Sequence, residues 1–259
     1  MSSNRPGATR LAQYLLLPII IAGGWELAAR TGLVQNTLLP PPSGVLAAFW
    51  NLLVRGRLLM HAAASLQRVL AGFALAAALG LGVGIAMGTS RAGGRLGDLV
   101  IQVLRPIPPI AWIPLAILWF GIGESSKVFI IFLGAVFPIV INTLEGIRAT
   151  DRRFVELARV LEVPRGRFVR QVILPGALPA IITGLRVGLG NAWVCVVAAE
   201  LIAADKGVGF IIVDGRELSR TDVVIAGMAT IGIIAKLMDV ALRHLEARLV
   251  RGRAAYSGE

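Results

Sequence analysis

The amino-acid sequence predicts an all-α, polytopic membrane protein with about six transmembrane helices. Of its 259 residues, 56% are hydrophobic and only 16% are charged, which is too apolar for a water-soluble domain of this length. The charged residues also gather in a few short segments between long uncharged runs. The formal net charge of +11 would by itself allow a nucleic-acid-binding protein, but this grouping favours the basic loops that flank membrane spans.

The first expected span is residues 11–29. A polar segment with Arg5 and Arg10 precedes it, which is also how a secretory signal peptide begins. The run is long enough to cross a bilayer, carries Trp25 and Glu26 near its end and lacks a small-x-small cleavage site. We therefore interpret it as a retained transmembrane helix.

A surface segment is expected next. Consecutive prolines at 40–42 exclude a helix there, and Ser43 is placed to cap an amphipathic stretch from Val45 toward Leu59. Such a stretch lies at the lipid boundary, here on the outer face. The chain then divides into an N-terminal unit over 1–61, a transmembrane core over 62–250 and a short tail over 251–259.

The second expected span, residues 69–89, contains no charged residue. It carries a small residue at every fourth position, namely Gly72, Ala76, Gly80, Gly84 and Gly88. Small residues allow the backbones of two membrane helices to approach closely. Because each step of four residues drifts by about 40° around a helix, we expect about three of them to meet any one neighbour. A helix merely loosened by its glycines is the alternative.

Residues 105–114, RPIPPIAWIP, combine an arginine with four prolines. One straight helix cannot hold them, so the third span, which continues to residue 123, should contain irregular backbone at membrane depth. Such backbone is tolerated only against protein or a wet cavity. We expect this stretch either to line a solute path or to form a kink at a helix start, with short loops at 90–98 and 124–127 on its two sides.

The fourth and fifth spans are expected at 128–144 and from Pro175 to Ala204. The fifth is apolar except for Arg186 and Glu200, and it repeats the small-residue pattern at 176, 180, 184, 188 and 192. An ionisable residue inside a span is a functional candidate, although Glu200 lies near enough to the helix end for a structural role. The lone Cys195 is expected to be a small buried hydrophobe.

A polar loop over 205–222 leads to the last expected span, 223–245. In that span Lys236 and Asp239 are three residues apart and can neutralise one another. Residues that could line a path share a position inside an expected span and either a polar group or a break in the backbone. They are Pro108, Pro109, Trp112, Arg186, Asn191, Trp193 and Glu200.

A polar island, residues 145–175, separates the fourth and fifth spans. Its arginines are too costly for hydrocarbon, so it must lie in water. Apolar residues recur at helical spacing on one face (Phe154, Leu157, Ala158 and Leu161), Asp151 stands at the N-cap position and Pro164 follows the helix. We expect a helix, a turn and a second short helix over 165–171, with one face free for a partner. An amphipathic surface helix without a partner is the alternative.

This island resembles the cytoplasmic coupling loop of the membrane subunits of ATP-binding-cassette importers. The family pattern is Glu-Ala-Ala, three residues, Gly, nine residues, Ile, one residue, Leu-Pro. Here Glu156 and Ala158 match the triplet around Leu157, Glu162 stands at the glycine, Val172 stands at the isoleucine, and Leu174-Pro175 match. The residues that the resemblance assigns to ATPase coupling are Arg153, Glu156, Leu157, Ala158, Arg159, Leu161, Glu162, Pro164, Leu174 and Pro175.

The glycine position is the main departure from that pattern. A residue other than glycine in a left-handed, helix-ending conformation costs roughly 1 kcal/mol. Either Glu162 bears this strain or Pro164 forms the turn differently.

Further motifs narrow the resemblance. The segments RPIPPIAWIPLAILWFGIGE at 105–124, TGLR at 183–186, VAAELIAA at 197–204 and RTD at 220–222 are similar to type I, binding-protein-dependent permeases for nitrate, alkanesulfonates, taurine and bicarbonate. The resemblance implies a bacterial inner-membrane subunit that pairs with a second copy around a solute path. It also implies two cytoplasmic ATP-binding subunits, an external solute-binding protein and a small anion such as taurine, an alkanesulfonate or nitrate as solute.

The charge distribution predicts the orientation. Six crossings place both termini on one side, and basic residues are more numerous in the amino end, 90–98, 145–170 and the tail than in the opposite loops, so these regions should be cytoplasmic. The chain has no Gly-x4-Gly-Lys-Ser/Thr phosphate loop. We therefore expect no catalytic site, metal or cofactor in this chain, with ATP and Mg bound by the partner subunits. An ion-coupled secondary transporter or channel, driven by ion gradients instead of ATP, is the alternative.

Overall fold

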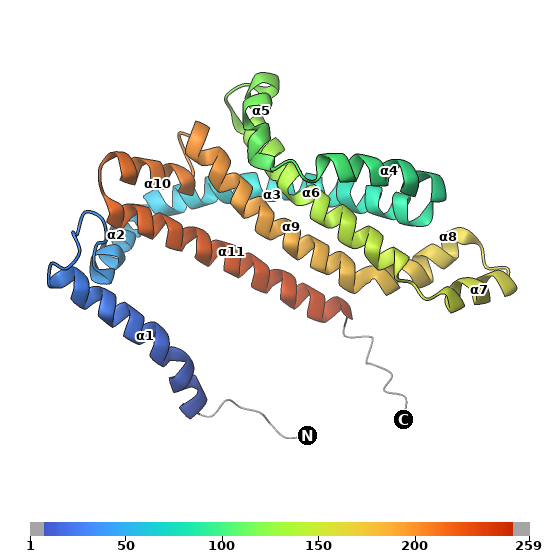
Figure 1. The fold of residues 1–259 in the computed structure, drawn as a ribbon, viewed down its shortest axis with the longest axis horizontal. Coiled ribbons are helices and arrows are strands. Elements are labelled where there is room, and N and C mark those ends of the chain that lie inside the picture. Colours follow the sequence, from blue (N-terminus) through green and yellow to red (C-terminus); the bar gives the residue numbers. More distant parts are fainter. Residues whose placement is uncertain (1–7, 251–259) are drawn as a thin grey trace.

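The computed structural model describes residues 8–250, and these are almost entirely helical, with no strand among them (Figure 1). The all-α prediction is therefore confirmed. The longer helices are α1 (Ala8–Arg30), α3 (Arg57–Thr89), α6 (Glu124–Arg148), α9 (Leu174–Ala203) and α11 (Thr221–Val250). The shorter ones are α2 (Pro42–Val54), α4 (Arg91–Leu104), a 3-10 turn η1 (Pro109–Trp112), α5 (Ile113–Phe120), α7 (Arg152–Val160), α8 (Arg165–Phe168), a π turn η2 (Val169–Ile173) and α10 (Val208–Glu217).

Within the described residues, four helices are long and apolar enough to cross a membrane, and a bent pair raises the number to five. The four are α3, α6, α11 and the continuous helix from Arg165 to Ile202 that contains α9. The bent pair joins residues 97–104 to 109–120 at an angle of 88°. The segment expected to be the first span is also helical, as α1, and its side chains from Leu16 to Ile21 are exposed as a lipid-facing surface would be.

Helices α3 and α6 pack closely along the small-residue stripe of α3. A Cβ added at Gly72, Gly80, Gly84 or Gly88 would lie 2.6 to 2.9 Å from a side-chain carbon of Ile131, Ile139, Thr143 or Ile147, respectively. Each later position in α3 contacts a later position in α6, so the two helices run parallel. More than three members of the stripe thus meet one neighbour, because α6 follows the stripe as it winds around α3.

Helix α9 packs against α6 in the opposite direction. Gly184 lies against Asn142, and Gly188 lies against Ile139, whereas an added Cβ at Gly176 would contact nothing. The small residues at positions 176, 180, 184, 188 and 192 of α9 therefore do not all lie at helix contacts. The main core forms where α3, α5, α6 and α9 meet, around Ile131, Ile139 and Ala192. Cys195 is free and buried in it, as expected.

The parallel packing of α3 and α6 requires the chain between them to return along the bundle. Helix α4 and the η1–α5 unit make this return, and they meet at a sharp break at residues 105–108, next to α6 (Figure 1). The prolines explain the break, since each lacks the N–H that a continuous helix needs. The irregular backbone expected in the third span is confirmed.

Several element boundaries differ from the sequence predictions. Residues 91–98 are helical in α4, and residues 124–127 are the first turn of α6, so neither segment is a loop. The turn before α6 is made by Gly121–Gly123 instead, where Gly121 has a φ of 76°. The expected loop over 205–222 contains helix α10, and the amphipathic segment ends at Val54 because Gly56, with a φ of 70°, turns the chain into α3.

Helix α2 is capped differently from the prediction. The helix begins at Pro42, and the carboxylate of Glu26 on α1 accepts hydrogen bonds from the backbone N–H (3.0 Å) and the hydroxyl (2.8 Å) of Ser43. Glu26 thereby supplies the cap that was expected from the side chain of Ser43. This contact fixes α1 to α2.

Candidate functional site

Helix α7, inside the coupling segment 145–175, begins as the sequence predicts. The carboxylate of Asp151 accepts a hydrogen bond of 2.9 Å from the backbone N–H of Arg153, so Asp151 is the N-cap. A capped start stabilises a helix of nine residues, which is too short to be stable by itself in water.

The end of α7 shows how the chain forms the turn without a glycine. Glu162 has a φ of 51°, in the left-handed region, and the N–H of Val163 donates to the carbonyl of Ala158 at 2.9 Å. This hydrogen bond closes a Schellman motif with Glu162 at the position usually held by glycine. Glu162 therefore takes the strained conformation, while Pro164 is the N-cap of α8.

The apolar face of α7 is largely uncovered. Phe154, Leu157, Val160 and Leu161 are 54%, 54%, 79% and 65% exposed. Arg153 and Glu156 are exposed beside them, and Ala158 is half-buried on the side that faces the bundle. The side chain of Arg159 lies outside the described residues. A short polar segment thus presents large apolar side chains to its surroundings, which is typical of a protein-binding surface.

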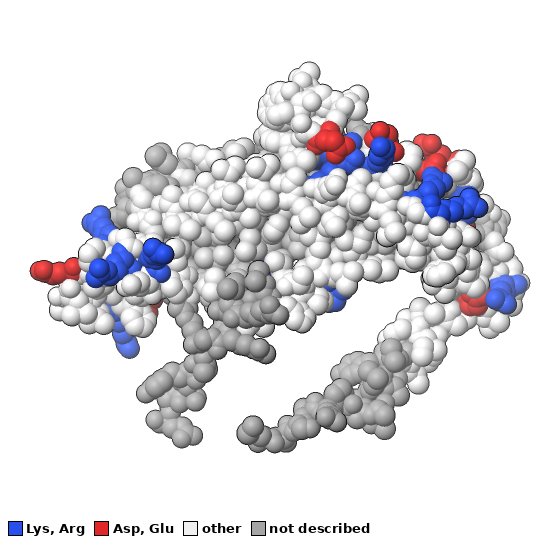
Figure 2. All heavy atoms as spheres, turned by 180° about the vertical axis from the view of Figure 1, so that it is seen from behind, with Lys and Arg blue, Asp and Glu red and all other residues white. Residues whose placement is uncertain are grey.

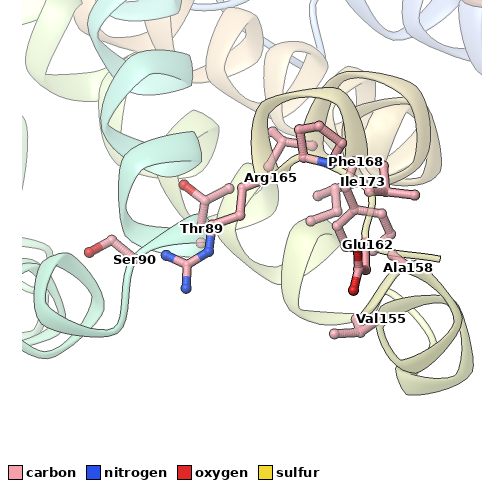
Figure 3. Close-up of a pocket in the computed structure, with 12 residues that line it drawn as sticks. Thr89, Ser90, Val155, Ala158, Glu162, Arg165, Phe168 and Ile173 are labelled. Atoms are coloured by element: carbon pink, nitrogen blue, oxygen red, sulfur yellow. The ribbon is translucent and has the colours of Figure 1, made fainter. Parts of the chain in front are cut away.

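A cleft of about 970 Å³ separates α7 from the end of α3 (Figure 3). Thr89 and Ser90 form one wall, Val155 and Ala158 form another, and Phe168 and Ile173 close it on the side of the bundle. Arg165 extends across it toward Thr89. Helix α7 is therefore separated from the end of α3 and is joined by short connections to α6, through residues 149–151, and to α8, through residues 161–164.

The second short helix of the prediction is not separate. Helix α8 continues through the π turn of Val169–Ile173 into α9, so residues 165–203 form one helical rod. The π turn comes directly before Leu174 and Pro175, both half-buried, where the proline ring would otherwise collide with a backbone carbonyl. A displacement of α8 is consequently a displacement of α9.

The charges of the two ends differ. Basic side chains outnumber acidic ones at the end formed by α7 and α8, and basic and acidic groups lie close together near the opposite end (Figure 2). At that opposite end lies a set of polar residues, which we name the charge cluster: His61, Ser65, Arg68, Glu124, Lys127 and Glu200. All are buried except Glu124, whose side chain is 61% exposed.

Glu200 belongs to the charge cluster. Its carboxylate is 1% exposed and accepts hydrogen bonds from Arg68 (2.7 Å), the hydroxyl of Ser65 (2.7 Å) and the N–H of Gly209 (2.9 Å). Arg68 also binds both carboxylate oxygens of Glu124, at 2.5 and 2.6 Å. The structural alternative for Glu200 is thus favoured over a place on the path.

Three further path candidates, Arg186, Trp193 and Trp112, also contact protein. Arg186 forms an ion pair of 3.1 Å with Asp239. Trp193 is 3% exposed, and its indole N–H points to the sulfur of Met238 at 3.3 Å. Lys236 approaches Asp239 only to 3.9 Å. Trp112 packs half-buried against the main core.

The remaining candidates lie at one cavity. Pro109 and Asn191 line a space of about 320 Å³ between the break in the third span, α6 and α9, and Pro108 is exposed beside it. Arg105 and Asn142 line the same cavity and were missed as site residues. In the sequence, Arg105 could have been recognised as a candidate because it is a charged residue inside an expected membrane span. Nothing in the sequence places Asn142 opposite it, because that depends on the packing of α6.

Comparisons with known proteins decide the family. The model of the binding-protein-dependent transport system inner membrane component family matches residues 76–251. This chain belongs to that family. The match covers the whole bundle from the middle of α3 to the end of α11, including the coupling segment.

Relatives support this membership over most of the chain. The chain is 44% identical to the putative aliphatic sulfonates transport permease protein SsuC of Escherichia coli, covering 96% of this chain and 97% of the relative. It is 42% identical to the SsuC protein of Bacillus subtilis, covering 98% and 93%. It is also 42% identical to the taurine transport system permease protein TauC of E. coli, covering 87% and 84%.

The fold agrees with that of a chain in a solved transporter structure. An inward-facing MetNI methionine ABC transporter chain matches with a TM-score of 0.59 at 20% identity, over 74% of this chain and 93% of that one. This similarity shows the fold alone. The chain is accordingly a multi-span transport permease of the inner-membrane component family.

Proposed function

We propose that this chain is the permease of an ATP-driven importer of small sulfonate-type anions, and that α7 receives the force of two separate ATP-binding subunits. The exposed apolar face of α7 carries the proposal. Relatives named for aliphatic sulfonates and taurine support the solute class. A second copy of the chain, an external binding protein and a cytoplasmic position of α7 and both termini complete the assembly.

The mechanism follows from how α7 is connected. ATP binding draws the two partner subunits together, and their surfaces move α7. The turn at Glu162 and the rod of residues 165–203 pass this movement to α9, which packs along α6. Packed helices shift as rigid bodies between discrete arrangements, so the path opens alternately to the two sides.

Charge reversal on α7 tests the coupling. In proteoliposomes that contain the permease, its ATP-binding subunits and its binding protein, Glu156→Arg should lower ATP-driven uptake of an alkanesulfonate by about tenfold or more, as expected for loss of an interface hot spot. Charge reversal of the exposed Glu145, on the last turn of α6 and outside α7, is the matched control. Uptake by Glu156→Arg equal to that of the control would contradict the coupling role.

The second candidate, an ion-coupled secondary transporter, needs an acidic group free to take up and release an ion. Within the described spans, Glu200 and Asp239 each pair with an arginine instead. Uptake that follows an ion gradient and persists without ATP would support this candidate over the importer.

A further inference from the structure

Arg105 differs from the other cations inside the spans. Arg68 pairs with Glu124 and Glu200, Lys127 with Glu124, and Arg186 with Asp239. Among the carboxylates whose side chains the structure describes, none lies within ion-pair distance of Arg105, and the side chain of Arg105 is exposed. A charged side chain with neither partner nor water is costly inside a bilayer.

Arg105 lies near the middle of the membrane-spanning helices along their length. The cavity that it lines is formed on α6 by Leu133, Phe137 and Ile141, which lie around the middle of that 25-residue helix, and on α9 by Asn191. The ends of α6 and α9 lie near opposite surfaces, so the middle of both helices marks the middle of the membrane. Arg105 therefore sits near mid-depth and not at a headgroup layer.

The irregular backbone around Arg105 also indicates that this region faces water. Residues 105–108 are the break between the two halves of the bent pair, where carbonyls lose their helical partners. Irregular backbone at this depth occurs only where it is buried in protein or faces water. Arg105 and the break line one cavity of about 320 Å³, so that cavity is the wet side of the bundle.

We infer that this cavity is the anion contact site of the solute path. Arg105 binds the oxyanion head group, the exposed amide of Asn191 donates a further hydrogen bond, and Leu133, Phe137 and Val187 contact a short apolar tail. Arginine matches the oxygens of such a head group with parallel N–H donors. The inference rests on the proposed function and adds to it the residues that face the solute.

Transport by the complete complex gives the first test. With ethanesulfonate as probe, Arg105→Gln should lower uptake by about tenfold, the loss expected for one charge-assisted hydrogen bond, while ATP hydrolysis stimulated by the binding protein stays unchanged. Arg105→Lys should recover most of the uptake. Arg55→Gln, an exposed arginine outside the cavity, is the matched control. Wild-type uptake by an assembled Arg105→Gln complex would overturn the inference.

Thiol labelling of the full-length chain in membranes gives a second test that needs no transport. In a Cys195→Ala background, Asn191→Cys should react several-fold faster with a thiosulfonate reagent that carries an ethylsulfonate group than with one that carries a trimethylammonium group. Adding Arg105→Gln should remove this preference. Equal rates with Arg105 present, or no reaction with either reagent, would overturn the inference even if Arg105 variants failed to assemble.

These outcomes separate the two proposals. Failure of the importer proposal would appear as uptake independent of ATP or as loss of the ATP-binding subunits in the wild-type chain. Failure of the anion site would appear as normal uptake and labelling in Arg105→Gln while ATP dependence remains.

Discussion

The two ends of the bundle are built in opposite ways. At the charge cluster, Arg68 of α3 and Glu200 of α9, at 4% and 1% exposure, pair with each other. Arg68 also pairs with Glu124 of α6, and the backbone N–H of Gly209 in α10 donates to Glu200. At the other end, α7 stands apart across a cleft, with its apolar face uncovered. One end is joined by ion pairs between helices, and at the other end α7 is attached through its short connections to α6 and α8.

The difference shows how a bundle can be both rigid and responsive. A buried ion pair is strongly destabilising to break, because it leaves an uncompensated charge in an apolar environment. Movement therefore costs most at the charge cluster and least at α7. We expect the cluster to act as the fixed point about which α9 shifts when α7 is moved.

The largest effect should come from breaking the charge cluster. Arg68→Ala leaves Glu200 buried without its cation and should destabilise the protein by about 3 to 5 kcal/mol. Arg57→Ala removes an ion pair of 3.4 Å between half-exposed groups and should cost about 0 to 1 kcal/mol. Thermal unfolding of the purified variants in detergent measures both. Equal losses in the two variants would mean that the two pairs hold the bundle similarly.

A smaller effect is expected from the packing that connects the two ends. Gly84→Leu places a side chain where a Cβ would lie 2.7 Å from Cβ of Thr143 and should cost about 1 to 3 kcal/mol or more. Gly82→Leu, on the same helix with nothing within 4 Å, should leave stability nearly unchanged. The same unfolding assay compares them. If Gly82→Leu were the more harmful, α3 and α6 would not pack along this stripe.

The smallest effect should come from the turn of α7. Glu162→Gly removes a left-handed strain of about 1 kcal/mol, so residues 161–165 should be cleaved more slowly by protease and ATPase binding should be kept. Glu162→Val, with a β-branched side chain at a positive φ, should have the opposite effect. Faster cleavage of the glycine variant would show that the carboxylate of Glu162, and not the turn, stabilises this segment.

The sequence predicts best the features that depend on residues within one helix. The proline break at 105–108, the N-cap of Asp151 and the close packing of Gly72 to Gly88 follow from residue spacing and local chemistry. The exposed apolar face of α7 follows from a helical pattern inside a segment too polar for the membrane.

The sequence was least informative where distant segments meet. Glu200 could not be assigned to Arg68 and Ser65, because they lie on another helix far away in the chain. Likewise, Glu26 caps α2 from α1, and Asn142 lines the same cavity as Arg105 only once α6 is packed. The sequence predicts a loop where α10 lies, because the short apolar run of this helix is interrupted by Asp214 and Gly215.

Crosslinking tests most directly that α7 is the contact point for the ATP-binding subunits. In the assembled complex with Cys195 replaced by alanine, Leu157→Cys, at a 54% exposed position, should crosslink to an ATP-binding subunit with a short bifunctional thiol reagent. Leu79→Cys, equally exposed at 55% on the membrane-spanning α3, should not. Capture through Leu79→Cys but not through Leu157→Cys would contradict the account.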